Sequence, residues 1–143
     1  MTMELRVEDP KIFQIVTLFG TLGICPKDFY ETDDRISILL DEEHLPSLPE
    51  VRNMLVYVKK ITKKKADVVF YSDDIKKFCE YLFHPAKIRK IEQRNSRKGK
   101  ILIVYVNFWQ KGMALGAKSY KLYRARFFIK KYFPEVENVY IQA

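Results

Sequence analysis

The sequence has few of the residues that carry metal and covalent chemistry. Among its 143 residues there are two cysteines, two histidines and one tryptophan. Cys25 and Cys79 are too few for a disulfide framework or a four-ligand zinc site. His44 and His84 each lack a second ligand residue at helical or hairpin spacing. We therefore predict reduced thiols, no metal site and no cofactor.

Long apolar runs and catalytic motifs are also absent. No run of about 18 apolar residues occurs, and the first residues lack the basic-then-apolar pattern of a secretory signal. The sequence contains neither the Gly-x-Ser-x-Gly of hydrolases nor the Gly-x-x-x-x-Gly-Lys-Ser/Thr of phosphate-binding loops. The acidic residues at 33–34 and 41–43 do not have the spacing of a calcium loop. We expect a cytoplasmic protein with no membrane segment and no catalytic residue, and we predict that it is not an enzyme.

Charge is unevenly distributed along the chain. The net charge is +8, but residues 1–58 hold 5 basic and 11 acidic side chains, whereas residues 59–143 hold 21 and 7. Between Lys111 and Lys131 there are seven basic residues, no acidic residue and several aromatic ones. This composition is typical of a domain that binds a polyanion, with a solvated lysine-rich surface as the alternative.

Hydrophobic periodicity indicates one series of elements that occurs twice. The first series consists of a helix near 12–22, strands near 28–31 and 35–40, a helix near 48–61 and a strand at 68–71. The second consists of a helix near 75–83, strands at 88–94 and 101–106 joined by a hairpin loop at 95–99, helices at 111–115 and 119–133, and a strand at 138–142. Such a repeat predicts two small α+β domains in tandem.

The helix predicted over residues 119–133 has an apolar face and an adjacent basic face. Its apolar side chains share one arc, which we expect to be buried: Leu122, Ala125, Ile129 and Tyr132. Basic side chains share the neighbouring arc: Lys121, Arg124 and Lys131, with Lys118 just before the helix. We predict that this basic ridge, together with the N–H groups at the helix start, favours a phosphate. For Trp109, which follows a predicted strand, we favour a packing role over base stacking.

Several segments resemble the paired type II KH domains of archaeal-type NusA proteins. The stretch Tyr71-Ser-Asp-Asp74, followed by Phe83-His-Pro-Ala-Lys-Ile-Arg89, is similar to the junction between their two KH domains. Further similar segments lie in the second domain: Lys111-Gly-Met-Ala-Leu-Gly-Ala-Lys118, Ala125-Arg126, Lys131-Tyr132-Phe133 and Glu137-Asn-Val-Tyr140. The resemblance extends over about residues 10–142, which is nearly the whole chain.

The resemblance implies an α+β fold of two tandem type II KH-like domains, at 1–71 and 72–143. Each would be a three-stranded sheet with helices packed on one face. The family implies a small RNA-binding factor that works with RNA polymerase in transcription elongation or termination. Its single-stranded RNA would lie beside a Gly-x-x-Gly loop between two helices, where glycine lets the backbone approach the phosphates.

Both copies of that loop depart from the family pattern. In the second domain it reads Gly116-Ala117-Lys118-Ser119, so the first glycine is kept and the last is serine. Serine can cap a helix N-terminus and lysine can pair with a phosphate. We therefore assign RNA contacts to this loop and to the basic residues near it: Lys111, Gly116, Ala117, Lys118, Ser119, Lys121 and Arg124.

In the first domain the equivalent loop is expected near Leu48-Pro-Glu-Val51. It has no glycine, and acidic residues and prolines surround it. We predict that this domain is a scaffold or a protein-docking half rather than a phosphate-binding one.

Two other functions compete with RNA binding. A degenerate KH module could dock on RNA polymerase or a ribosomal assembly without direct RNA contact, as the loop departures and the acidic first domain suggest. Double-stranded DNA binding through the basic helix is the weaker option, because no dimerisation heptads or zinc-finger spacing accompany that helix.

Overall fold

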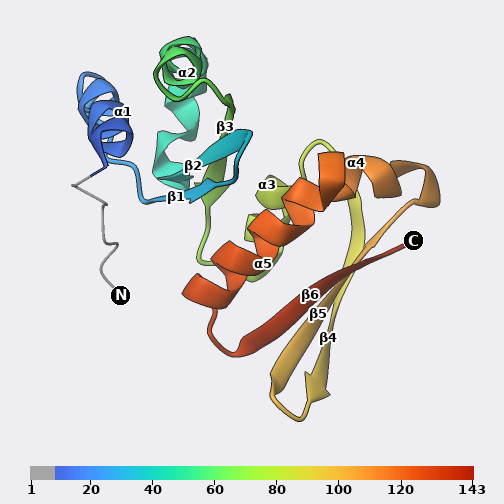
Figure 1. The fold of residues 1–143 in the computed structure, drawn as a ribbon. Coiled ribbons are helices and arrows are strands. Elements are labelled where there is room, and N and C mark those ends of the chain that lie inside the picture. Colours follow the sequence, from blue (N-terminus) through green and yellow to red (C-terminus); the bar gives the residue numbers. More distant parts are fainter. Residues whose placement is uncertain (1–8) are drawn as a thin grey trace. The chain divides into compact units, whose positions relative to one another are not determined.

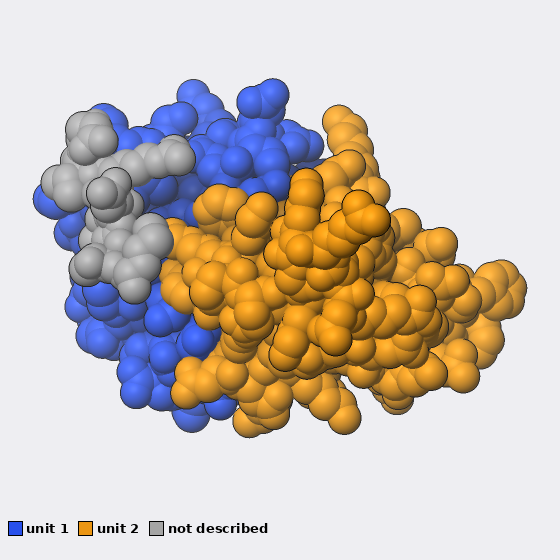
Figure 2. Space-filling view, turned by 90° about the horizontal axis from the view of Figure 1, so that it is seen from below, with its two compact units in different colours: residues 1–71 blue, residues 72–143 orange. Residues whose placement is uncertain are grey.

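The computed structural model describes residues 9–143, which divide into two compact units with the boundary between Tyr71 and Ser72 (Figure 2). The first unit contains α1 (Pro10–Gly20), β1 (Asp28–Glu31), β2 (Arg35–Asp41), the 3-10 helix η1 (Glu42–Ser47), α2 (Leu48–Thr62) and β3 (Lys65–Tyr71). The second contains α3 (Ile75–Phe83), β4 (Ile88–Ser96), β5 (Gly99–Val106), η2 (Phe108–Gln110), α4 (Lys111–Leu115), η3 (Ala117–Ser119), α5 (Tyr120–Tyr132) and β6 (Val136–Gln142). The predicted α+β fold with two three-stranded sheets is confirmed (Figure 1).

Both sheets have the same topology. In the first unit β1 is antiparallel to β2 and β2 is parallel to β3; in the second, β4 is antiparallel to β5 and β5 is parallel to β6. A parallel pair needs a long crossover, which α2 supplies in the first unit and α4 with α5 in the second. The repeated series of elements in the sequence therefore corresponds to a repeated sheet in the structure.

The first helix of each unit begins with the same chemistry. The Asp9 carboxylate accepts a hydrogen bond from the Lys11 N–H at 3.0 Å, and the Asp74 carboxylate accepts one from the Lys76 N–H at 3.0 Å. In both cases an extended aspartate satisfies a backbone donor that the helix leaves unpaired. Local sequence alone thus determines where α1 and α3 begin.

In the second unit the helices cover one face of the sheet (Figure 1). Leu102, Val104 and Val106 alternate along β5 and are fully buried. From the helices, Phe78 of α3 and Phe128 of α5 are also fully buried. Because alternate residues of a strand point to one face, these side chains form a single core between β5 and the helices.

Two local predictions differ from the structure. The hairpin between β4 and β5 has a turn of two residues, 97–98, instead of a loop over 95–99, because pairing continues to Ser96 and Gly99. The Ser96 hydroxyl donates to the Gly99 carbonyl at 2.8 Å and closes this turn. On α5, Phe128 is buried while Leu122 is only half-buried, since the helix packs against both α3 and β6 and its buried arc is wider than expected.

The outer edge of β6 is occupied by a side chain of α5. The Arg126 Nε–H donates to the carbonyl of Val139 at 3.0 Å. Its guanidinium also lies 5.4 Å from the centre of the Tyr140 ring. One backbone acceptor of this edge strand is therefore paired within the unit.

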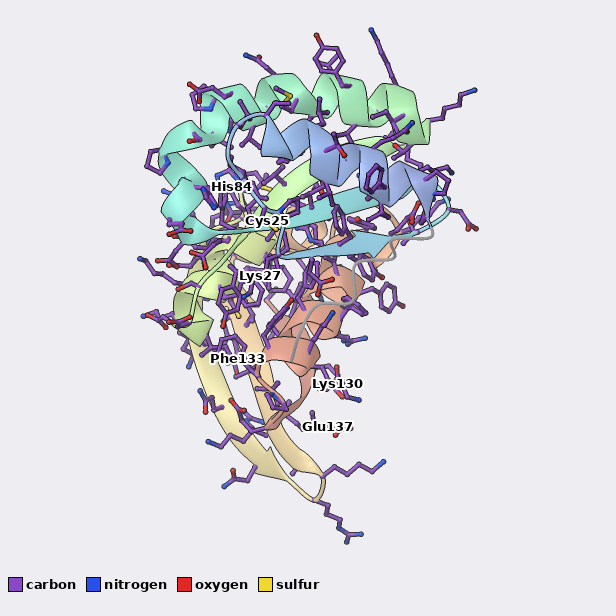
Figure 3. All side chains as sticks on the ribbon, turned by 90° about the vertical axis from the view of Figure 1, so that its left-hand side faces the viewer. Cys25, Lys27, His84, Lys130, Phe133 and Glu137 are labelled. Carbon is purple, nitrogen blue, oxygen red and sulfur yellow. The ribbon has the colours of Figure 1, made fainter. Side chains whose placement is uncertain are left out.

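The two cysteines lie in very different surroundings. Cys25 is exposed in the loop between α1 and β1 (Figure 3). Cys79, in contrast, is fully buried in α3. Burial raises the pKa of the Cys79 thiol to about 12, and the carboxylates of Glu80 and Asp74 add to the effect. The thiolate is the form that reacts with thiol reagents. Cys79 is therefore protected from such reagents both by its burial and by its protonation.

We predict that a thiol reagent modifies one cysteine in the native protein at pH 8 and two in denaturant. Because the pKa of the Cys79 thiol is raised to about 12, the thiol stays protonated between pH 7 and 9, and raising the pH over this range will not make it reactive. Intact-mass measurement after timed labelling checks this, with Cys25→Ser as the control that abolishes native labelling. Rapid labelling of both thiols in the native state would contradict the prediction.

Candidate nucleic-acid interface

The loop between α4 and α5 has an unusual backbone. Gly116 has φ 77° and ψ 174°. Two and three residues later, Lys118 and Ser119 have left-handed backbone conformations, with φ 54° and 60°. A Cβ atom at Gly116 would lie 2.9 Å from Cγ and 3.2 Å from the backbone N of Lys121. The first glycine is thus required by the bend itself, before any ligand is considered.

We predicted that Ser119 caps α5, and the structure shows that it does not. It occupies the N-cap position, but its side chain makes no capping hydrogen bond. An N-cap side chain reaches the first-turn N–H groups from an extended backbone, and Ser119 is left-handed instead. The serine that replaces the second glycine therefore takes over the backbone conformation of a glycine without contributing a cap.

Three of the predicted contact residues lie together at the surface of this region. Ala117 and Lys118 are exposed in the loop, and Lys111 is exposed at the start of α4. Since α4 has five residues, its two ends are about 8 Å apart. Lys111 and Lys118 can accordingly reach neighbouring groups of one extended ligand.

Lys121, predicted to lie on the basic ridge, has a structural role. Its ammonium group donates to the carbonyl of His84 at 3.0 Å and to the carbonyl of Met113 at 3.2 Å. His84 follows the last residue of α3, and Met113 lies in α4. A cation at helix C-termini satisfies unpaired carbonyls and the negative end of the helix dipole.

Arg124 is buried, so the prediction that it lies on an exposed ridge is wrong. It is only 2% exposed, and its Nη2 donates to the carbonyl of Leu82 in the last turn of α3 at 2.6 Å. The guanidinium lies 5.6 Å from the centre of the Tyr120 ring. Helical periodicity placed Arg124 on a basic arc but gave no sign that the end of α3 would lie against that arc.

The residues that the sequence reasoning missed are aromatic. Phe108 and Trp109 in η2 are 77% and 71% exposed, so the predicted packing role of Trp109 is wrong. Their rings lie edge to face, with centroids 6.0 Å apart. The sequence did hold a signal for their exposure, because the apolar run of β5 ends at Val106 and the aromatic pair lies just before the segment rich in lysine.

The segment that forms this surface is rich in basic residues. Residues 93–134 contain eleven lysine and arginine residues and no aspartate or glutamate. Glu92, the last acid before this segment, is hydrogen-bonded to Arg94, which holds the pKa of the carboxyl below its usual value. A segment rich in lysine and arginine and without acidic residues attracts phosphate rather than cations.

The corresponding region of the first unit differs. Residues 48–51, where a loop was expected, form the first turn of α2, which follows η1 directly. Between residues 9 and 71 the residues with positive φ are Gly23 and Lys63, and neither lies next to the start of α2. No left-handed bend therefore leads directly into α2. Asp41, Glu42 and Glu43 lie at the start of η1 and disfavour a phosphate there.

No group of three or more histidine, cysteine, aspartate or glutamate side chains in residues 9–143 is arranged to hold a metal ion. None of the helices described is long and apolar enough to cross a bilayer.

Comparison with known proteins gives a similar fold. No family model matches the chain, and no curated protein matches it. A solved structure, "Crystal structure of APE1850", is similar with a TM-score of 0.73 and 25% sequence identity, over 91% of this chain and 96% of that chain. The name states no activity, and the likeness covers both units of the fold.

We predict opposite effects of alanine at the two glycines near this surface. Gly116→Ala should lower the free energy of unfolding by about 1–3 kcal/mol, because it combines a Gly-type backbone with a close Cβ contact. Gly112→Ala, in α4 with no atom within 4 Å of the added Cβ, should raise it by up to about 1 kcal/mol. Urea unfolding measures both, and equal effects would contradict the assignment of the bend.

We also predict that Arg124→Met destabilises the protein by about 1.5–3 kcal/mol, because the buried Leu82 carbonyl loses a charged donor. Lys130→Met on the exposed side of the same helix should change stability by less than about 0.5 kcal/mol (Figure 3). Thermal and urea unfolding of the two variants test this. Similar stability of both would show that the Arg124 contact carries no energy.

Proposed function

We propose that this protein binds single-stranded RNA through its second unit. The observation that carries the proposal is the loop 116–119, which joins two helices by a glycine bend and contains exposed Lys118, with exposed Lys111 at the start of α4. Phosphates can approach such a bend closely, and the absence of acidic residues over 93–134 favours them.

The topology supports a relation to type II KH domains. Each unit runs helix–strand–strand–helix–strand, with one antiparallel and one parallel strand pair. In the second unit the crossover is split into α4, the glycine bend and α5, which is the place of the Gly-x-x-Gly loop in the KH domains that the sequence resembles. We infer that the chain is a KH-like protein of the archaeal NusA type with altered loops.

A role in transcription elongation or termination follows from that relation. In such a role, the second unit would bind RNA that emerges from RNA polymerase. The contact set is smaller than predicted from the sequence, since Lys121 and Arg124 serve the fold. Lys111 and the residues of the loop 116–119 remain for the ligand.

The first unit favours a second candidate function. Its α2 begins without a glycine bend and beside three acidic residues, so phosphate has no comparable place there. Docking of this unit on a basic protein surface, such as one of RNA polymerase or a ribosomal assembly, is the alternative. A complete lack of RNA binding by the folded chain would favour this alternative.

The test is titration of the full chain with short single-stranded RNA at several salt concentrations. If about 3 to 5 phosphates are contacted, the log–log salt slope should be roughly −2 to −3.5. Lys111→Glu combined with Lys118→Glu should remove most binding to every sequence alike, and neutralising the same two residues with glutamine should reduce the slope by about 1.4.

Lys59→Glu combined with Lys60→Glu is the matched control. These residues are exposed in the last turns of α2 in the first unit, and the substitution changes net charge by the same amount. Equal loss of affinity in both double variants would show that RNA binding depends on the net charge of the protein and not on the position of Lys111 and Lys118. Unchanged affinity of the Lys111/Lys118 variant would overturn the proposed function.

A further inference from the structure

The most exposed large apolar side chains of the described residues lie in η2, one short helix before the proposed phosphate-binding loop. Phe108 is 77% and Trp109 71% exposed, and Met113 on the next turn is 45% exposed. Apolar groups of this size are normally buried, so a contiguous exposed set indicates contact with another molecule.

The aromatic pair is held in place by the backbone around it. The Lys87 N–H donates to the side-chain carbonyl of Gln110 at 3.1 Å, which ties η2 to the segment before β4. The Gln110 N–H donates to the Asn107 carbonyl at 2.8 Å and closes the turn. These hydrogen bonds fix the turn from which the two rings project. Ordering this turn on a ligand therefore costs little conformational entropy.

Position and charge determine which ligand fits. Gln110 alone separates the pair from Lys111, and α4, which is about 8 Å long, lies between the pair and the bend at Gly116 in the chain. Exposed Lys87, Arg89, Lys111 and Lys118 belong to the same part of the unit, and residues 93–134 have no acid. Aromatic faces beside phosphate-binding cations suit an unpaired nucleobase on a sugar–phosphate chain.

We propose that Phe108 and Trp109 form a base-stacking platform that extends the RNA site of the second unit. This inference rests on the proposed function, because the cations hold the backbone while the aromatic pair holds a base. The two ring planes are 82° apart, so a given base stacks on only one of them. The platform should accept any base, because stacking does not read hydrogen-bonding edges.

The experiment uses the intrinsic fluorescence of Trp109, the sole tryptophan of the chain. Oligouridine and an abasic oligomer of equal length, which retains the phosphates, are titrated against the full protein. We expect quenching by oligouridine and little quenching by the abasic oligomer. Phe108→Ala combined with Trp109→Ala should weaken oligouridine binding by about 5- to 150-fold, measured with labelled RNA, and leave abasic binding unchanged.

Phe13→Ala combined with Tyr57→Ala is the matched control, because both residues are exposed aromatics of the first unit. This control should bind oligouridine like the unaltered protein. Circular dichroism confirms that each variant is folded.

Failure of this inference is distinguishable from failure of the proposed function. If the Phe108/Trp109 variant binds oligouridine normally while the Lys111/Lys118 variant does not, RNA binding stands and the stacking platform is overturned. That result would assign the aromatic pair to a protein partner. If the unaltered protein binds no single-stranded RNA, both are overturned.

Discussion

The second unit depends on two cations of α5 that pair with the ends of other helices. Carbonyl groups at helix C-termini lack partners within the helix and carry the negative end of its dipole. Lys121 meets those of His84 and Met113, and Arg124 meets that of Leu82. These contacts hold α3, α4 and α5 together, and they fix the bend at Gly116 that α5 follows.

This arrangement divides the basic residues between structure and ligand. Half-buried Lys121 and buried Arg124 bond to helix-end carbonyls, whereas Lys111 and Lys118 are exposed near the bend. The strained backbone at Lys118 and Ser119 is maintained because the helices on either side are fixed. A positively charged composition therefore does not translate directly into a positively charged binding surface.

Most of the fold was predictable because the relevant signals are local. Alternating residues identified β2, an apolar run matched β5, and periodic apolar residues identified α1, α2 and α3. The duplicated series predicted the two three-stranded sheets. The short turn between β4 and β5 was not predictable from composition, because the polar residues 95–96 pair although they resemble a loop.

The candidate site was predictable only in part. The glycine bend and Lys118 followed from the sequence pattern. The burial of Arg124 depends on the end of α3, which lies about forty residues earlier in the chain, and no local pattern shows such a contact. The exposure of Trp109 was not predicted, because a large apolar residue that follows a strand is usually buried in the core.

One contact at the margin of the second unit affects assembly. Edge strands offer unpaired backbone groups on which a further strand can be added, and β6 is such a strand. Arg126 takes one of those acceptors and places a charge with an aromatic ring beside it. Another chain would have to displace the guanidinium before its own strand could pair there, so continuous sheets between copies are disfavoured along this edge.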